Sequence, residues 1–200
     1  MTTPLTVRLP QPDFTGEVPV EQALLMRRSE RAFSPRSVSQ AELSQLLWAA
    51  QGVTRPRGQR TAPSAGALYP LEIIAAVGLV PELPPGIYRY RSADHTLIPS
   101  AAGDRRGELA RAALNQRFVA RAPVVLVVAA VYARVCTVYG QRGVRYTDME
   151  AGHAAQNVSL QAVALGLGTV MVGAFTDTEV RRVALLTPEE EPLYLIPVGR

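Results

Sequence analysis

Side chains suited to acid–base, nucleophilic or metal chemistry are scarce in this sequence of 200 residues. All 21 basic residues are arginines, so the chain has no lysine for a Schiff base, a phosphate-binding loop or a general base. Cys136 is the single cysteine, which excludes an internal disulfide, and we expect it to be a small, half-buried hydrophobic residue. These residues alone do not indicate a mechanism.

The two histidines, with one cysteine, are too few to build a four-ligand zinc site. Glu150 and His153 stand at the Glu-x-x-His spacing of di-iron bundles, but the chain offers no second copy of this spacing on another helix. We therefore expect no metal, and a buried, hydrogen-bonded structural role for His153. His95 follows Asp94 in a predicted turn, where we expect it at the surface.

Two short segments have compositions that suit ligand binding. Arg27 to Arg31 (RRSER) is either a solvated helix end, whose arginines favour the C-terminal helix dipole, or a cluster that binds an anion. Pro63 to Pro70 (PSAGALYP) is either a plain turn or a loop whose small residues let the backbone approach a flat ligand. The residue types leave both alternatives open.

Hydrophobic periodicity and capping residues predict the elements that must position these segments. We expect helices over 20–30, 39–52, 104–114, 147–166 and from Thr176, and strands over 71–77, 87–91, 96–99, 124–131, 170–175 and 193–198. Residues 53–62 read as a loop. Ser39 with Glu42, and Thr147 with Glu150, each form a capping-box pattern at a helix start. This order of elements predicts an α+β fold.

The longest predicted element, Thr147 to Gly166, is small or apolar on nearly every face, which is typical of a helix buried all round. A chain of 200 residues does not readily cover such a helix, so we expect a symmetric dimer. The net charge of +4 is scattered among acids, and we expect no nucleic-acid partner.

The longest apolar run, Ala122 to Ala133, is shorter than the ~20 residues that a membrane helix needs. We therefore expect no membrane contact. The N-terminal sequence has no secretory signal, which predicts a cytoplasmic protein.

Six motifs resemble the nitroreductase superfamily of FMN enzymes, in particular the branch that includes the SagB-type dehydrogenases. They are RRSERAF (27–33), PSAGALYPLE (63–72), GIYRYRSADHTL (86–97), YGQRGVRYTDMEAGHAAQN (139–157), GLGTVMVGAF (166–175) and EPLYLIPVGR (191–200). The resemblance implies a single nitroreductase-like FMN-binding domain over 1–200, with 1–17 as an N-terminal extension. It implies a central mixed or antiparallel sheet flanked by helices, and a homodimer with its long buried helix at the interface.

The resemblance also implies that both chains of the dimer build each FMN site. Arg27, Arg28, Ser29 and Arg31 resemble the group that binds the phosphate, the ribityl chain and the N1/O2 edge. Pro63, Ser64, Ala65, Gly66 and Leu68 resemble the segment of the other subunit that lies along the isoalloxazine ring. Val172, Gly173 and Ala174 resemble the strand end whose backbone N–H faces N5, and Arg200 resembles the closing basic residue near the phosphate.

The implied activity is FMN-dependent oxidoreduction. NAD(P)H reduces a tightly bound FMN, and a nitroaromatic, a quinone or a similar acceptor then takes the electrons in a ping-pong sequence. SagB-type azoline dehydrogenases of peptide precursors carry a Lys-Tyr pair before the glycine of the YG motif, whereas this chain has Val138-Tyr139. That activity is therefore the alternative, with a non-turnover FMN-binding module as a third possibility. Tyr139 is the catalytic candidate, either as a proton donor or as a structural phenol beside Arg142 or Arg145.

Overall fold

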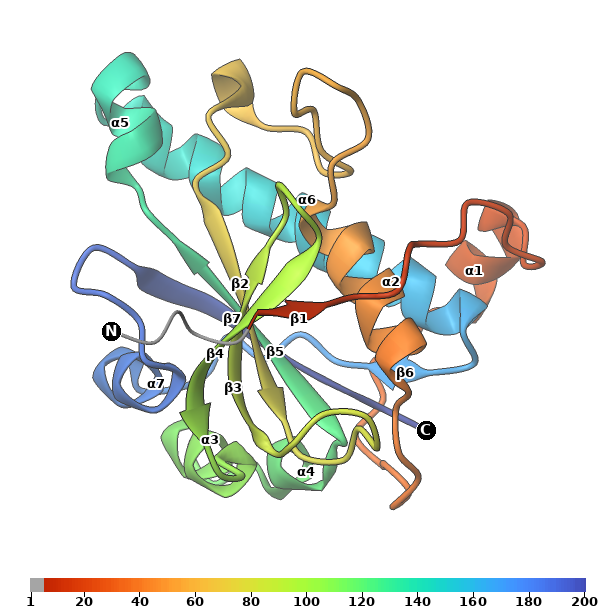
Figure 1. Cartoon of the computed structure of the whole chain (residues 1–200). Helices are drawn as coiled ribbons and strands as arrows, with labels where there is room; N and C mark the ends of the chain where they lie inside the picture. The colour runs from red at the N-terminus through yellow and green to blue at the C-terminus, as the bar shows by residue number, and fades with distance from the viewer. Residues whose placement is uncertain (1–5) are drawn as a thin grey trace.

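A single antiparallel sheet forms the centre of the computed structural model, which describes residues 6–200 (Figure 1). Its strand order is β1-β4-β3-β2-β5-β7-β6, and every pair of neighbouring strands is antiparallel. The strands are β1 (Val7–Arg8), β2 (Leu71–Val77), β3 (Gly86–Arg91), β4 (Thr96–Ala102), β5 (Val124–Ala130), β6 (Gly168–Thr169) and β7 (Glu191–Gly199). The first five residues of the predicted N-terminal extension lie outside the described residues.

Helices cover both faces of this sheet. They are α1 (Val20–Met26), α2 (Gln40–Gln51), α3 (Arg106–Ala112), α4 (Arg117–Arg121), α5 (Ala133–Tyr139), α6 (Arg142–Ala164) and α7 (Asp177–Ala184). One hydrophobic core lies between the sheet and α2 and α6, and a second lies between the sheet and α3, α4 and α7. The predicted α+β class, with a central sheet flanked by helices, is confirmed.

The central strand β5 shows why two cores form. Successive side chains of a strand point to opposite faces, and Leu126 and Val128 belong to the α2–α6 core whereas Val125 and Val127 belong to the opposite core. All seven of its residues are buried. An apolar run without polar alternation therefore predicts a strand with helices on both sides.

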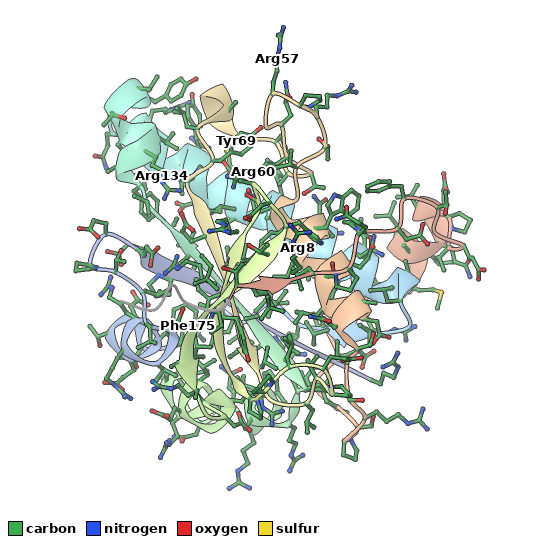
Figure 2. All side chains as sticks on the ribbon, viewed as in Figure 1. Arg8, Arg57, Arg60, Tyr69, Arg134 and Phe175 are labelled. Atoms are coloured by element: carbon green, nitrogen blue, oxygen red, sulfur yellow. The ribbon has the colours of Figure 1, made fainter. Side chains whose placement is uncertain are left out.

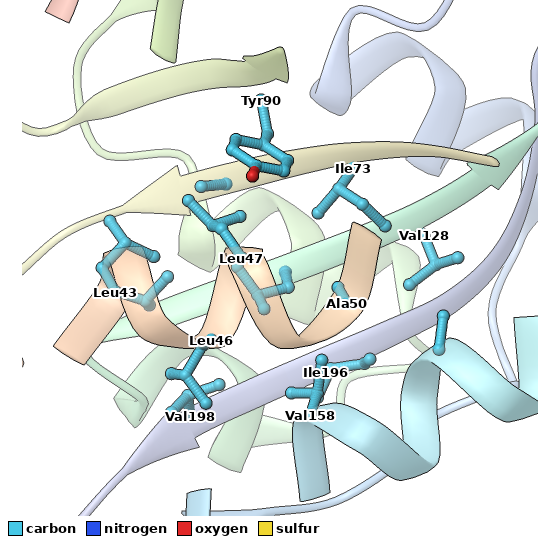
Figure 3. Close-up of a cluster of buried hydrophobic side chains, with 14 of the residues drawn as sticks. Leu43, Leu46, Leu47, Ala50, Ile73, Tyr90, Val128, Val158, Ile196 and Val198 are labelled. Atoms are coloured by element: carbon cyan, nitrogen blue, oxygen red, sulfur yellow. The ribbon is translucent and has the colours of Figure 1, made fainter. Parts of the chain in front are cut away.

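Helix α2 packs on the sheet and is buried over most of its surface. Its side chains Leu43, Leu46 and Leu47 lie against Ile196 and Val198 of β7 and their neighbours (Figure 3). The predicted capping box is confirmed: Ser39 Oγ accepts from the Glu42 N–H, and the Glu42 carboxylate accepts from the Ser39 N–H. The helix ends at Gln51, just before Gly52, as the sequence predicts.

Helix α6 differs from the predicted helix over 147–166 in where it begins and in how much of it is buried. It begins at Arg142, five residues before the predicted start. Thr147 therefore lies inside the helix, and its hydroxyl donates to the Gly143 carbonyl instead of capping. The residues buried on α6 recur at intervals of three and four and form one stripe, while His153 is exposed. One chain therefore buries α6 along this stripe only, and the expected dimer partner for its other faces remains a prediction.

Other element boundaries also differ from those predicted. Helix α1 ends at Met26, so residues 27–31 follow it in extended backbone. The predicted strand over 170–175 does not form: the two-residue strand β6 lies just before it, and within it only Val172 makes a bridge, to Leu195 of β7. Asp104 does not cap α3 from the N-cap position, which Arg105 occupies; its Oδ1 atom accepts from the Arg106 N–H.

Two short helices, α4 and α5, are missing from the sequence prediction, because stretches of 5 and 7 residues are too short to reveal a helical period. None of the helices in residues 6–200 is long and apolar enough to cross a membrane.

Replacing Ser39 by alanine is expected to lower the free energy of unfolding by about 1 kcal/mol, because the N–H of Glu42 loses its acceptor. Thr176→Ala is the matched control. Thr176 occupies the N-cap of α7, but its side chain makes no capping hydrogen bond. Urea unfolding of both variants measures the difference, and equal destabilisation would contradict the assignment.

Candidate functional site

The arginine-rich segment Arg27 to Arg31 joins the edge of the sheet. Ser29 forms a parallel bridge with Thr169 of β6, and the Glu30 N–H donates to the Thr169 carbonyl at 2.9 Å. Gly168 permits this approach, since a Cβ atom there would lie 2.8 Å from the Glu30 side chain. Arg27 is the C-cap of α1, and the residues after it run in extended backbone that is fixed to β6.

Arginines of this segment face different surroundings. Arg28 is exposed and lies 3.7 Å from the Glu30 carboxylate. Arg31 is also exposed, and its guanidinium carbon lies 5.9 Å from the centre of the Phe118 ring on α4. Arg27 is half-buried. Exposed guanidinium groups so close together form a local positive field that suits an anion.

A recess of about 630 Å³ adjoins this segment. Its cationic lining residues are Arg28, Arg36 and Arg200, and Gly166, Gly168 and Gly199 are among the others. The Arg200 guanidinium forms an ion pair with Glu42 and donates to the Ser37 carbonyl at 3.0 Å. Arg200 therefore lies at the recess, as its predicted role requires, but a carboxylate already engages it.

The predicted ring-binding segment Pro63 to Leu68 forms a tight loop. Gly66 has a φ of +60°, a left-handed conformation that glycine adopts without steric cost. Ala67 and Tyr69 also have positive φ angles, of 53° and 47°, which is strain of a kind that collects at functional sites. The Ser64 hydroxyl accepts from the Tyr69 N–H at 2.9 Å and closes the loop.

Tyr139 lies beside this loop. A Cβ atom at Gly66 would lie 3.0 Å from the Tyr139 hydroxyl oxygen, so the two predicted site residues are neighbours. The Tyr139 ring makes an edge-to-face contact with Tyr146, with ring centres 5.3 Å apart. The arginine that stacks in this region, Arg142, lies over Tyr146 and not over Tyr139.

A polar cluster that the sequence did not predict lies behind the loop (Figure 2). Arg60 stacks on the Tyr69 ring at 4.5 Å and donates from Nη1 to Gln51 Oε1 at 2.8 Å. Burial lowers the pKa of Arg60. Arg134 of α5 donates to the Tyr69 carbonyl at 3.1 Å and pairs with Glu72 of β2.

The cluster was missed because Arg60 lies in an aperiodic loop, and its partners come from α2, α5, α6 and β2. No local pattern connects residues that are so distant in sequence.

The third predicted group, Val172, Gly173 and Ala174, follows β6 along the chain. Val172 exchanges two backbone hydrogen bonds with Leu195 of β7, each 2.9 Å long. Gly173 and Ala174, which come next, are exposed. The Ala174 carbonyl accepts from Gln116 Nε2 at 3.1 Å. This stretch therefore leaves the sheet directly after one bridge and presents its backbone at the surface.

One chain does not bring the loop and the arginine segment together. The loop lies beside the N-terminal half of α6, where Ser64 neighbours Glu150 and Gly66 lies beside Tyr139, just before α6 begins. The arginine segment lies beyond the C-terminal end of α6, next to Thr169. From Glu150 to Gly166 is about 24 Å at a rise of about 1.5 Å per residue, and Figure 1 shows α6 running between the two regions.

The histidines depart from both predictions. His153 is exposed, so the buried structural role expected for it is wrong. His95 is half-buried instead of lying at the surface; its Nε2 is 2.7 Å from Ser44 Oγ and its Nδ1 is 2.9 Å from the Tyr90 hydroxyl. Burial lowers the pKa of His95. Cys136 is half-buried. Within residues 6–200, no three His, Cys, Asp or Glu residues gather as a metal site.

Comparisons with known proteins agree with this architecture. A sequence model of the Nitroreductase family matches residues 24–200. A Methanocaldococcus jannaschii protein named as a nitroreductase is 48% identical over 195 residues, which are 98% of this chain and 97% of the relative.

Two more distant relatives extend the comparison. A crystal structure from Ralstonia eutropha, also named as a nitroreductase, is 32% identical with a TM-score of 0.85 and covers 98% of this chain and 89% of its own. The trifolitoxin operon protein TfxC of Rhizobium leguminosarum bv. trifolii is 25% identical, over 88% of this chain and 54% of the relative. By family match, fold and identity over nearly its whole length, this chain belongs to the nitroreductase family of oxidoreductases.

Proposed function

We propose that this protein is an FMN-dependent oxidoreductase that takes electrons from NAD(P)H and passes them to a nitroaromatic, a quinone or a similar acceptor. The observation that carries this proposal is the pairing of a cationic recess beside β6 with a strained loop of small residues, in a chain of the nitroreductase family. The absence of lysine, the single cysteine and the two histidines fit a reaction whose chemistry belongs to a cofactor.

The residues at the two regions fit the chemistry of FMN. Its phosphate is an anion, and Arg27, Arg28 and Arg31 supply cations that stay protonated at all physiological pH values. Arg200 can add a further charge from the recess if it exchanges Glu42 for the phosphate. The exposed backbone at Gly173 is available to donate toward the ring. Small side chains in Pro63 to Gly66 allow a flat ring to lie against the loop.

A homodimer would complete each site. The loop and the arginine segment lie at opposite ends of α6, so an antiparallel pair of α6 helices would bring the loop of one chain to the arginines of the other. Exposed apolar residues support this arrangement at both ends of α6. Leu25 on α1 is 85% exposed, Val138 on α5 is 62% exposed, and Met149 on α6 is 47% exposed. Such side chains are commonly covered by a partner.

When bound, FMN would supply the electron-transfer chemistry, by accepting a hydride from the nicotinamide and releasing electrons to the second substrate. The residues of this chain would bind the flavin and polarise it. Arginine charge near the N1/O2 edge favours the negative, reduced form of a flavin by electrostatic attraction. We propose no protein nucleophile. Tyr139, beside Gly66, is placed to contact a substrate that lies over the loop.

Azoline oxidation in a peptide precursor is the second candidate function. Its support is the similarity to TfxC, a protein named for a toxin operon, although this chain spans about half of that relative. Val138 stands where the resemblance expects a lysine before Tyr139, which removes one proton-transfer group from that reaction. We therefore rank it below reduction of small acceptors.

Anaerobic addition of NADPH or NADH to the purified, flavin-loaded protein is expected to bleach the flavin absorption, and a nitroaromatic is expected to restore it. Absorption spectroscopy follows both steps. A bound flavin that neither nicotinamide bleaches would indicate a non-turnover flavin module. A protein that neither carries nor takes up FMN would contradict the proposal.

Arg27→Ala is expected to weaken FMN binding by about 10- to 150-fold, since a charge-assisted hydrogen bond contributes ~1.5–3 kcal/mol. Arg57→Ala is the control, because it removes the same charge from an exposed loop position that points away from the molecule (Figure 2). Titration of both apoproteins at one ionic strength measures the difference. Equal affinities would show that the segment does not bind the cofactor.

Mixing two variants that each bind FMN weakly, at an FMN concentration too low to fill either variant alone, tests whether the site is shared. Arg27→Ala impairs the cationic part, and Gly66→Val distorts the loop because valine is strained at a φ of +60°. After joint refolding, about a quarter of all sites should regain FMN, because about half of randomly mixed dimers are heterodimers with one intact site each. Recovery of no site above the separate variants would contradict a shared site.

A further inference from the structure

Two glutamates, Glu150 and Glu190, are almost fully buried, and their surroundings differ. Glu190 is 4% exposed and accepts two hydrogen bonds from the Arg89 guanidinium, at 2.7 and 2.9 Å, and one from the Thr187 N–H at 2.8 Å. Glu150 is 2% exposed, and its Oε1 atom has no hydrogen-bond partner among residues 6–200. A buried carboxylate is costly unless it is paired, so Glu190 has a structural explanation and Glu150 lacks one.

The pKa of Glu150 also indicates that its ionised form is not fully compensated by its neighbours. Burial raises the pKa of Glu150, while the neighbouring Ser64, Arg60 and Gln51 act in the opposite direction. Because the pKa is raised in the folded chain, the stability associated with this group is present below the ordinary carboxyl pKa and is lost as the pH rises through the raised value. Ionised Glu150 therefore destabilises the fold, and such groups cluster at functional sites.

Glu150 lies behind the loop that carries Pro63 to Gly66. Its neighbour Ser64 accepts from the Tyr69 N–H, and its neighbour Arg60 stacks on the Tyr69 ring while the Arg60 N–H donates to the Tyr69 hydroxyl at 3.2 Å. Both groups thus fix the same tyrosine and close the loop. Gln51 connects Arg60 to α2, because Gln51 Oε1 accepts a hydrogen bond from the Arg60 guanidinium. The Gln51 Nε2 atom has no partner among the described residues.

We propose that Glu150 is a positioning residue for the cofactor-facing loop: its buried charge attracts Arg60 and Ser64 behind Pro63 to Gly66, and so favours the surface presented to the flavin. This inference rests on the proposed function. The groups that face the carboxylate are Arg60 and Ser64 from the loop and Gln51 from α2. Glu72 of β2 and Arg134 of α5 lie farther out, beside Arg60, and pair with each other.

Protonation of Glu150 at acidic pH removes the charge that attracts Arg60. Affinity for FMN should then fall as the pH is lowered through the raised pKa of this carboxyl. Stability should change in the opposite sense, because the neutral carboxyl is easier to bury.

Apoprotein titrations with FMN from pH 5 to pH 8, at one ionic strength, test the proposal with Glu150→Gln and Glu190→Gln. We expect Glu150→Gln to bind FMN about tenfold more weakly at pH 8, to lose the acid-side pH dependence of the wild type, and to unfold at an equal or higher temperature at pH 8. We expect Glu190→Gln to keep the affinity of the wild type and to be less stable, since Arg89 loses its partner.

Arg60→Gln provides a second route should Glu150→Gln not fold. It removes the charged neighbour of Glu150 and should also weaken FMN binding, whereas Arg57→Gln, in the exposed loop nearby, should not.

An FMN affinity and a pH profile in Glu150→Gln equal to those of the wild type would overturn the positioning role. A parallel loss of stability and affinity would overturn it too, because it would show a merely structural residue. Absence of FMN binding by the wild type is a distinct result: it would overturn the proposed function first, and this inference with it.

Discussion

Close packing of α6 against the sheet through one stripe of small residues is the constraint on which the candidate site depends. Ala151, Ala154 and Ala155 are buried in the core that α6 shares with α2 and the sheet. Small side chains let the helix axis lie close to its neighbours, and the stripe fixes the rotation of the helix. Because α6 is rigid and 23 residues long, it also fixes how far apart the loop and the arginine segment lie. A single chain therefore keeps the loop and the arginine segment apart.

Charged side chains have different partners in the framework of sheet and helices than near the loop Pro63 to Leu68. In the framework, arginines meet carboxylates directly: Arg89 binds Glu190 through two hydrogen bonds, and Arg106 pairs with Asp104. Near the loop, Arg60 has an amide and an aromatic ring as its closest partners, and Glu150 is buried without a full set of hydrogen bonds. Incomplete pairing costs stability and leaves groups that can respond to a ligand.

Particular residues show how far the sequence predicted the fold and the site. The Ser39–Glu42 box and the strand over 71–77 were predicted correctly, because both depend on neighbours a few residues away. Thr147 and Glu150 carry the same capping pattern, yet α6 begins five residues before Thr147. It starts just after Gly140, the C-cap residue of α5. The six motifs indicated the family correctly, whereas the residue roles they imply remain predictions.

The sequence by itself determined the class of protein, the apolar run of the central strand and the composition of the two candidate segments, since these are properties of residue order. Only the tertiary structure decided which face of α6 is buried, that Arg27 to Arg31 joins β6, and that Glu150 is buried with an unpartnered carboxylate oxygen. The bridge from Ser29 to Thr169, for example, joins residues 140 positions apart. The energies of such contacts depend on burial and on the direction of each side chain, which a local pattern does not contain.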